Sequence, residues 1–402
     1  MSRRSSTSPR EHERDRRART GPPSRHTGTT RLDVDTLLDD DDTGIIVCCG
    51  SGGVGKTTTS AALALRAAER GRKVVVLTID PARRLAQALG LTALDNTPRA
   101  VADVDTASGG SLDAMMLDMK RTFDEVVEAH ARPDKARQIL TNPFYIALSS
   151  SFAGTQEYMA MEKLGQLYAD AQSSGRWDLI VVDTPPSRSA LDFLDAPERL
   201  SSLLDGRLIR LLLAPAKGPA KVFSAGFGIV TATMSKILGA QVLRDVQTFV
   251  AAFDTLFGGF RQRAEQTYAL LQAQGTAFLV VAAPEPDALR EAAYFVDRLT
   301  QEDMPLAGIV LNRTTEPRAD LSAEEAHAAA ARLGDVDSSL ACAAGLLHVH
   351  ESLATAHARE TRLRHRFAAA HPQVAGAAIP ALAGDVHDLD GLRTVGALLT
   401  TS

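Results

Sequence analysis

The sequence predicts an α/β fold in which a doubly wound, mostly parallel sheet carries an inserted α-helical subdomain. From Thr43 onward, short apolar runs alternate with longer segments of helical periodicity, which is the pattern of strands connected by crossover helices. The short runs are apolar at nearly every position, whereas strands with one solvent-exposed face alternate apolar and polar residues. Both faces of the sheet should therefore be covered by helices, with the chemistry at the carboxyl ends of the strands.

Seven apolar runs are expected to be strands, and they span residues 44–49, 73–79, 112–117, 178–182, 277–282, 306–311 and 376–379. The expected helices between them include residues 56–70, 284–299 and 321–370. Two stretches, at about residues 119–175 and 197–275, interrupt the alternation and are expected to be helical insertions. The second carries Leu, Phe and Met stripes that fit either a buried core or a groove for a client, and the sequence leaves both open.

The composition of the 402 residues is that of an ordinary globular protein, with 45% hydrophobic and 23% charged residues. It excludes collagen-like, coiled-coil and wholly disordered chains. The net charge of −5 gives no electrostatic reason to expect a specific nucleic-acid partner. Three cysteines do not make a disulfide framework, and the uncharged segment most like a membrane span, residues 222–235, is too short to cross a bilayer. We therefore expect a cytoplasmic protein.

Residues 1–43 differ in composition from residues 44–402, which we expect to form the folded domain. The first 31 residues carry nine Arg against three acidic residues, and residues 32–42 then carry six Asp. Segments this polar bury too little apolar surface to offset the entropy of ordering the backbone, so we expect a disordered charged tail. A solubilising extension and an arm for RNA or a membrane surface both fit it. The apolar side chains between residues 32 and 38 are spaced so that they could form a short docked turn.

The first expected strand and the first expected helix are joined by a complete GxxxxGK(S/T) motif. It consists of Gly50, Ser51, Gly52, Gly53, Val54, Gly55, Lys56 and Thr57, and Thr58 follows it. The glycines let backbone amides turn inward around a β-phosphate, and the helix N-terminus adds its positive dipole end. Lys56 should reach the β- and γ-phosphates, and the Thr57 hydroxyl should bind Mg²⁺. The sequence therefore predicts a nucleoside-triphosphate site.

Two further expected strands end in aspartate. Asp80 follows the strand at 73–79, and Asp183 follows the strand at 178–182. A carboxylate at the end of a strand beside a phosphate loop can hold Mg²⁺, usually through water, or position an attacking water. Aspartate also ends strands as a turn former, which is the alternative interpretation of each. With the phosphate loop beside them, Asp80 and Asp183 are predicted to be catalytic and metal-binding residues.

These motifs, in this order, resemble those of the ArsA-like family, which includes the arsenical-pump ATPase and the tail-anchored-protein targeting ATPase, within the wider MinD/ParA-like group of P-loop ATPases. Residues 50–58 are similar to the group's GKGGVGKTT. Residues 80–83, DPAR, resemble the first-switch sequence DPAH, and residues 183–187, DTPPS, resemble the second-switch sequence DTAPTGH. Residues 153–157, AGTQE, are similar to the family's PGxxE segment. The resemblance covers roughly residues 44–400.

The resemblance implies a Mg²⁺-dependent ATPase that works as a dimer, with ATP and Mg²⁺ as its cofactors. It implies that Asp80 orients or activates the water, and that Asp183 couples Mg²⁺ and the γ-phosphate to movement of the second switch. Pro284 falls at the adenine-side loop and Asn312 at the adenine-binding position, although an Asn that merely ends a strand in a turn fits as well. The helical insertion would bind a client, either a hydrophobic protein segment or a membrane partner.

Ser51 departs from the family, which has a second lysine at this position that reaches across a dimer to the phosphates bound by the other subunit. A homodimer of this chain would lack both lysines, so one hypothesis is a heterodimer with a related subunit that retains the lysine. The rival is a nucleotide-binding regulatory or scaffold subunit with little ATPase activity of its own. A small-molecule P-loop kinase is disfavoured by the helical insertion and the DPAR segment.

The cysteines and histidines give little reason to expect a further metal site. Cys48 and Cys49 precede the phosphate loop and Cys342 lies in an Ala-rich helix, which is typical of small core residues. The sequence offers no evident thiol cluster for arsenite and no CxxC pair for the zinc site of the targeting branch. Four histidines are expected to lie on a solvated helix face instead of forming a metal site: His348, His350, His357 and His365.

Overall fold

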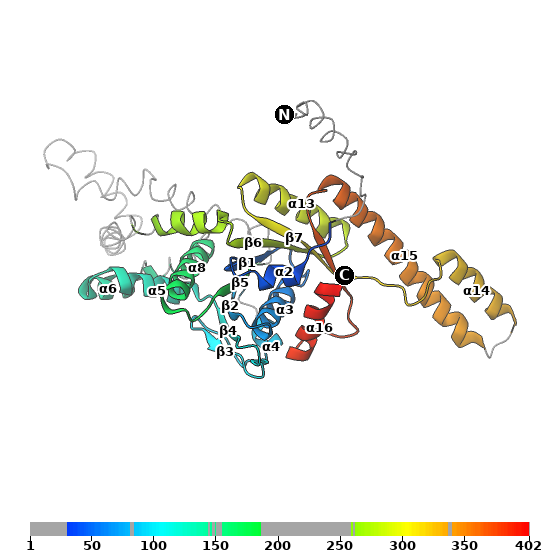
Figure 1. The fold of residues 1–402 in the computed structure, drawn as a ribbon, viewed down its shortest axis with the longest axis horizontal. Helices are drawn as coiled ribbons and strands as arrows, with labels where there is room; N and C mark the ends of the chain where they lie inside the picture. Colours follow the sequence, from blue (N-terminus) through cyan, green and yellow to red (C-terminus); the bar gives the residue numbers. More distant parts are fainter. Residues whose placement is uncertain are drawn as a thin grey trace, which may run out of the picture.

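The computed structural model of the protein describes residues 30–80, 84–143, 145–146, 149, 155–185, 259, 262–336 and 340–401. Its centre is an 8-stranded sheet in the order β3-β4-β2-β5-β1-β6-β7-β8 (Figure 1). Every pairing in this order is parallel except that of β3 with β4. The predicted doubly wound, mostly parallel α/β fold is confirmed.

The strands are β1 (Ile45–Cys49), β2 (Lys73–Thr78), β3 (Arg99–Ala100), β4 (Ser111–Met116), β5 (Leu179–Asp183), β6 (Thr276–Ala282), β7 (Leu306–Thr314) and β8 (Gly376–Pro380). All seven predicted strands are present, with ends that shift by a few residues. β3 is missing from the prediction because its two residues are exposed and form no apolar run.

The described helices are α2 (Val34–Asp39), α3 (Lys56–Glu69), α4 (Arg84–Ala88), α5 (Met119–His130), α6 (Pro133–Leu140), α8 (Thr155–Ser174), α13 (Pro286–Gln301), α14 (Ala323–Val336), α15 (Ala341–Ala370) and α16 (Leu389–Thr401). As the helical pattern predicts, α5, α6 and α8 occupy the stretch at 119–175. Most of the stretch at 197–275, including its apolar stripes, lies outside the described residues. None of the helices in the described ranges is both long enough and apolar enough to cross a membrane.

Helices cover both faces of the sheet, and each face has its own hydrophobic core (Figure 1). In β1, Ile46 and Cys48 pack on the side of α3 and α16. Ile45, Val47 and Cys49 pack on the side of α5, α8 and α13. All five residues of β1 are buried, which explains why its sequence is apolar throughout.

The expected helical stretch at 321–370 is two helices. α14 and α15 pack against each other as a hairpin that projects from the body of the molecule (Figure 1). The sequence does not indicate where α14 ends and α15 begins, because both helices are rich in alanine and have similarly high helical propensity.

Residues 30–43 are ordered, which corrects the boundary of the expected disordered tail at 1–43. Leu32, Val34 and Leu38 are buried in the core that contains α3 and α16. Asp33 caps α2 by accepting a hydrogen bond from the backbone N–H of Thr36. The docked turn that the apolar spacing allows is therefore what the chain adopts. Residues 1–29 lie outside the described residues.

The aspartates of this segment are tolerated because arginines in and after α3 bind it. The guanidinium of Arg66 donates two hydrogen bonds to the carboxylate of Asp35, at 2.7 and 2.8 Å. Arg72, whose side chain is 8% exposed, donates to the carbonyl oxygens of Leu38, Asp40 and Thr43. A charge count along the sequence assigns all of these aspartates to solvent, whereas the fold pairs Asp35 with Arg66 and Asp39 with Arg70.

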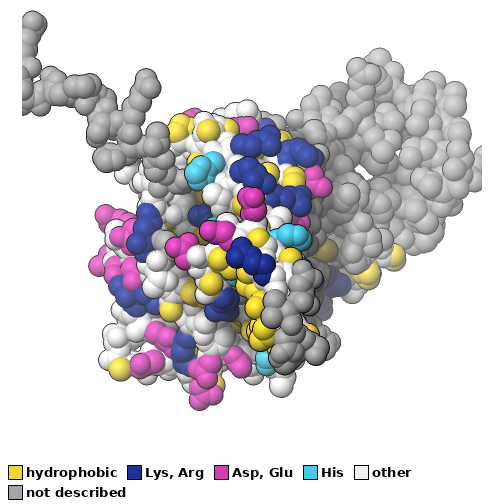
Figure 2. Space-filling view, turned by 90° about the vertical axis from the view of Figure 1, so that its right-hand side faces the viewer, with side chains coloured by type: hydrophobic (Ala, Val, Ile, Leu, Met, Phe, Trp, Pro, Cys, Tyr) yellow, Lys and Arg dark blue, Asp and Glu magenta, His cyan; other side chains and the backbone are white. Residues whose placement is uncertain are grey.

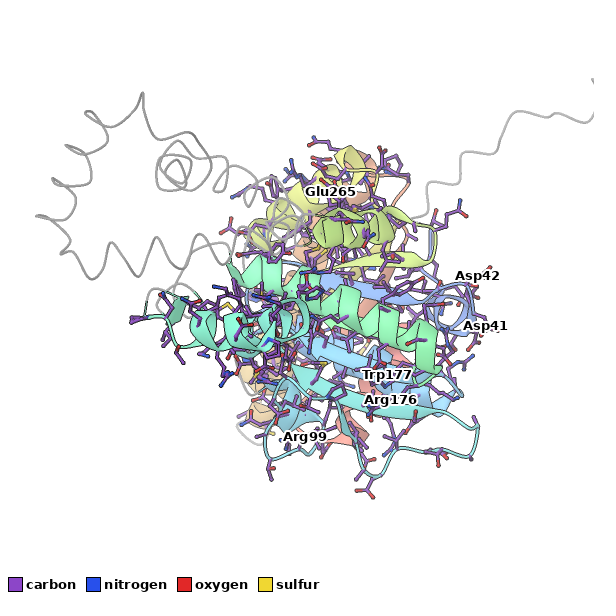
Figure 3. All side chains as sticks on the ribbon, turned by 90° about the vertical axis from the view of Figure 1, so that its left-hand side faces the viewer. Asp41, Asp42, Arg99, Arg176, Trp177 and Glu265 are labelled. Atoms are coloured by element: carbon purple, nitrogen blue, oxygen red, sulfur yellow. The ribbon has the colours of Figure 1, made fainter. Side chains whose placement is uncertain are left out.

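The chain between α8 and β5 is fixed by an aromatic residue. The guanidinium of Arg176 lies 4.4 Å from the ring centroid of Trp177. The two residues lie next to each other on the chain that leads into β5 (Figure 3). Both side chains donate to Oδ2 of Asp113 in β4, at 2.8 Å from Arg176 and 2.9 Å from the indole N–H. These contacts hold the start of β5, whose other end carries Asp183.

Candidate functional site

The loop at residues 50–55 joins β1 to α3 at the carboxyl end of the parallel sheet, and its geometry requires glycine. Gly50 has a φ of +148°, and a Cβ there would lie 2.1 Å from the carbonyl oxygen of Val281. Gly55, the N-cap of α3, has a φ of +94°, and a Cβ there would lie 2.1 Å from Nδ2 of Asn312. No side chain caps α3, so its first backbone N–H groups face the loop and suit an anion.

Lys56, the first residue of α3, folds back across this loop. Its side chain is buried, and its ammonium group donates a hydrogen bond to the carbonyl oxygen of Ser51 at 2.8 Å. Burial lowers the pKa of Lys56, while the nearby charge of Asp183 opposes that shift. Among the described residues, this backbone oxygen is the hydrogen-bond partner of the ammonium group, and a buried ammonium group is suited to a stronger anionic partner such as a phosphate.

Asp183 connects the loop to two strands. It is the last residue of β5 and is fully buried. Its Oδ2 accepts hydrogen bonds from the hydroxyl of Thr57 at 2.8 Å and from the hydroxyl of Thr78, the last residue of β2, at 2.9 Å. Its Oδ1 accepts no hydrogen bond from any residue that the structure describes.

Burial raises the pKa of Asp183 to about 6, although the hydrogen bonds from Thr57 and Thr78 and the charge of Lys56 act in the opposite direction. A buried carboxylate oxygen without a partner is costly, and a bound cation would satisfy it. The groups available to bind a cation are the Asp183 carboxylate and the Thr57 hydroxyl, which are oxygen ligands of the kind that Mg²⁺ takes. The residues present therefore fit Mg²⁺, with Thr57 and Asp183 as the groups that would hold it.

Asp80 lies beside this carboxylate. It follows β2, its backbone N–H donates to the Thr78 hydroxyl at 3.2 Å, and its negative charge contributes to the raised pKa of Asp183. The side chain is half-buried. The structure thus places Asp80 near the predicted metal site, while its assignment to water or to Mg²⁺ stays a prediction. The rest of the first switch, residues 81–83, lies outside the described residues.

The second switch begins at a fixed point. Thr184 directly follows Asp183, and its hydroxyl donates to the carbonyl oxygen of Cys48 in β1 at 2.8 Å. The chain from residue 186 to residue 200 lies outside the described residues. The start of the predicted switch is therefore tied to the strand that carries the phosphate loop.

Asn312, in the last part of β7, contacts the phosphate loop directly. Its side-chain amide donates a hydrogen bond to the carbonyl oxygen of Val54 at 2.8 Å. Pro284 is buried just beyond the end of β6. The adenine contacts of Asn312 and Pro284 stay predictions, and the contact between Asn312 and Val54 is a further role that the sequence did not indicate.

The sequence does not predict the contacts of two other residues at this edge of the sheet, Thr78 and Gln156. Thr78 shares the carboxylate of Asp183 with Thr57. Gln156, in the AGTQE segment, donates from Nε2 to the carbonyl oxygen of Ile79 at 3.1 Å and so links α8 to the end of β2. The only available signal for Thr78 is a hydroxyl residue that ends an apolar strand two positions before Asp80.

The three thiols do not converge. Cys48 and Cys49 are buried on opposite faces of β1, as expected of core residues. Cys342 is exposed on α15, so the interpretation of this cysteine as a core residue is wrong. Burial raises the pKa of the Cys48 thiol to about 12 and raises that of Cys49 as well, so neither supplies a thiolate at neutral pH.

The histidines of α15 differ in part from the solvated face that the sequence predicts. His350 is half-buried and its Nε2 lies 2.8 Å from the carbonyl oxygen of Leu321. His357 is half-buried and its Nδ1 lies 2.7 Å from the carbonyl oxygen of Thr315. These two histidines bind the segment that leads into α14, because that segment passes beside α15. His348 and His365 are exposed, as expected.

A glycine-rich loop that ends in a buried lysine, at the carboxyl edge of a parallel sheet and against a strand-end carboxylate, is the arrangement of a P-loop ATPase. The sequence model of the anion-transporting ATPase family, ArsA, matches residues 43–332, which is well over half of the chain. The chain belongs to this family.

Individual relatives match a shorter segment. The arsenical pump-driving ATPase of Escherichia coli is 30% identical over 146 residues, which are 36% of this chain and 24% of that protein. ATPase GET3 of Candida glabrata is 32% identical over 148 residues, 36% of this chain and 42% of GET3. ATPase BagA of Mycobacterium tuberculosis is 26% identical over 149 residues, 36% of this chain and 43% of BagA. Each alignment thus spans less than half of the relative's length.

Proposed function

We propose that the chain is a cytoplasmic, Mg²⁺-dependent ATPase subunit whose nucleotide cycle opens and closes a dimer and thereby controls a helical client-binding or partner-binding subdomain. The observation that carries the proposal is the shared carboxylate of Asp183. It joins the hydroxyl of Thr57 in the phosphate loop to Thr78 at the end of β2. A change at the γ-phosphate would therefore reach the starts of both switches.

The chemistry would be transfer of the γ-phosphoryl group to water, achieved by positioning and charge neutralisation. The loop amides and Lys56 hold the phosphates, and Lys56 exchanges the carbonyl oxygen of Ser51 for a phosphate oxygen. Thr57 and Asp183 would hold Mg²⁺, which would supply positive charge to neutralise the phosphates. Asp80, beside this carboxylate, orients the attacking water, so that the new oxygen–phosphorus bond forms as the bond to ADP breaks.

Movement would begin at two places where a fixed strand gives way to a switch. Asp183 ends β5, and Thr184 is held by the carbonyl oxygen of Cys48. Asp80 follows β2 and is held through Thr78. Loss of the γ-phosphate changes the contacts that the Asp183 carboxylate has to make, and this shifts both switches between two arrangements. The client, a hydrophobic protein segment or a membrane partner, would bind the subdomain at 197–275.

Ser51 supports a heterodimer. Its side chain is neutral and buried, whereas Gly52 and Gly53 beside it are exposed, so another subunit can approach the loop at these glycines. A related subunit with lysine at this position would supply the missing positive charge in trans, as an arginine finger does. A dimer of one such subunit and this chain would then have one fully equipped site.

The neutral Ser51 also favours a second candidate function. Without the charge in trans, the chain would bind ATP as a regulatory or scaffold subunit with little turnover of its own. ATP would still stabilise it, by about 2.7 kcal/mol at 100 times Kd. The two functions differ in whether phosphate is released when the lysine-bearing subunit is present.

Phosphate release separates these functions. It is measured for the purified chain alone, for the chain mixed with a lysine-bearing paralogue from the same cell, and for Ser51→Lys. The ATPase subunit predicts slow turnover alone and faster turnover in the mixture and in Ser51→Lys. Asp183→Asn in this chain, with the paralogue unchanged, is the control and should lower the rate of the mixture. ATP-dependent thermal stabilisation without phosphate release in any mixture would instead establish the regulatory subunit.

A further inference from the structure

The hairpin of α14 and α15 brings together three metal-ligating side chains that are far from the nucleotide site. His327 lies on α14, and His348 and Glu351 lie one turn apart on α15. Nδ1 of His327 is 3.0 Å from Oε1 of Glu351, and Nδ1 of His348 is 3.1 Å from Oε2 of the same carboxylate. One ligand atom from each of the three residues lies within 4.8 Å of the other two.

These spacings are close to those of a metal site. Zn²⁺ binds imidazole nitrogen and carboxylate oxygen at about 2.0–2.2 Å, so two ligand atoms at tetrahedral positions are about 3.3 Å apart. The nitrogen–oxygen distances at Glu351 are already within a few tenths of an ångström of that value. The imidazole rings of His327 and His348 contact each other edge to face, with centroids 6.1 Å apart.

The chemistry of the three ligating side chains determines which class of metal ion they would bind. Two imidazoles and one carboxylate suit Zn²⁺ and related divalent transition metals, whereas Mg²⁺ and Ca²⁺ prefer oxygen ligands alone. The two histidines are exposed and Glu351 is half-buried, so water can reach the fourth coordination position.

Apolar packing holds this hairpin together only weakly. The buried side chains of α14 among the described residues are Ala326 and Ala330, and the buried side chain of α15 is Ala344. Alanine side chains bury little area, so they contribute little hydrophobic free energy. Figure 2 faces the side of the molecule to which the hairpin projects, and it shows histidines and charged side chains of both signs among scattered hydrophobic groups.

We propose that His327, His348 and Glu351 form a binding site for a divalent transition metal of the Zn²⁺ class, which fastens α14 to α15. The site uses ligands from both helices, so the ion acts as a cross-link between them. It is separate from the Mg²⁺ site at Thr57 and Asp183, because its ligands lie on the projecting hairpin and include nitrogen.

The test measures Zn²⁺ binding to the untagged full-length chain by equilibrium dialysis with metal analysis. Saturating Mg²⁺ and ATP occupy the nucleotide site, and every protein carries Cys342→Ser, so that the exposed thiol of α15 takes no part. We expect one Zn²⁺ per chain. His327→Ala and His348→Ala should each weaken binding at least about tenfold, since removal of even an outer-shell partner has effects of that size. His365→Ala, an exposed histidine farther along the same helix, should bind as the parent does.

Equal Zn²⁺ binding by His327→Ala and His365→Ala would overturn the site, and so would the absence of stoichiometric binding by the parent. A second measurement tests the cross-link itself. Zn²⁺ should slow amide hydrogen exchange in α14 of the parent and of His365→Ala, and leave it unchanged in His327→Ala. Exchange that is unaffected by Zn²⁺ in a parent that binds the ion would overturn the fastening role. Circular dichroism confirms that each variant is folded.

Discussion

The side-chain amide of Asn312 donates a hydrogen bond to the carbonyl oxygen of Val54 at 2.8 Å, so β7 supports the phosphate loop from a position 258 residues away in the chain. The approach is close enough that Gly55 has no room for a Cβ beside Asn312 Nδ2. The loop is therefore shaped by β7 as well as by its own glycines, and nucleotide affinity should depend on this contact.

Asn312→Ala should weaken the binding of both ATP and GTP, because the loss of one buried hydrogen bond of about 1 kcal/mol lowers affinity about fivefold. Any additional loss for ATP over GTP measures the predicted contact with adenine. Isothermal titration of the two nucleotides, with Arg313→Ala as the neighbouring control, checks both parts. Unchanged GTP affinity would show that the loop does not need the Val54 contact.

Asp183→Asn should stabilise the nucleotide-free protein at pH 7 by about 1–3 kcal/mol and should abolish Mg²⁺-dependent nucleotide binding. The pKa of Asp183 is raised to about 6 in the folded state, so the folded protein binds a proton more tightly than the unfolded chain does. The free energy of unfolding of the parent therefore falls as the pH rises through about pH 4–6, where the folded state loses this advantage. Each pKa unit of difference between the folded and unfolded states corresponds to about 1.4 kcal/mol. The asparagine does not titrate and avoids this loss.

Urea unfolding of the parent and of Asp183→Asn at pH 4, 5, 6 and 7 measures the effect. The difference in free energy of unfolding should be smallest at pH 4 and largest at pH 7. Asp113→Asn is a control in β4, which β2 separates from β5, because that carboxylate contacts Arg176 and Trp177 instead of the nucleotide loop. A stability difference that does not depend on pH would contradict the assignment of the raised pKa to Asp183.

Lys56→Met should weaken ATP binding by about 10- to 100-fold, since hydrogen bonds to charged groups contribute about 1.5–3 kcal/mol each. The folded state should tolerate the change, because methionine fills a similar volume and removes a buried charge. Lys163→Met is the matched control, since Lys163 is also buried but pairs with Glu125 at 3.0 Å. ATP titration should separate the two variants, and equal affinities would count against Lys56 as the phosphate ligand.

Leu38→Ala should destabilise the protein by about 2–5 kcal/mol, because Leu38 is fully buried and its truncation leaves a cavity. Leu37→Ala, at the neighbouring half-buried position of α2, should cost less than Leu38→Ala. Chemical denaturation of both variants compares them. Equal and small effects would mean that residues 30–39 are not part of the cooperative fold.

Local sequence patterns were sufficient to predict every strand of the sheet except β3, as well as the glycine-rich loop and the two strand-end aspartates. They do not reveal hydrogen bonds between distant segments, so the roles of Thr78 and Asn312 appear only when the strand order places their strands near β1. The error at residues 30–43 has an electrostatic origin. A run of aspartates predicts solvation, yet Arg66 and Arg72 bind this segment through the fold.

Both outer strands of the sheet are poor sites for adding another strand. β3 offers two exposed residues at one end. At the other end, the backbone of residues 30–32 already pairs with Gly376 of β8, where the N–H of Gly376 donates to Thr30 at 2.8 Å and the N–H of Leu32 donates to Gly376 at 3.0 Å. Association by sheet extension is therefore obstructed. The second subunit that we propose would then meet this one through helices or loops, such as the exposed tip of the glycine-rich loop at Gly52 and Gly53.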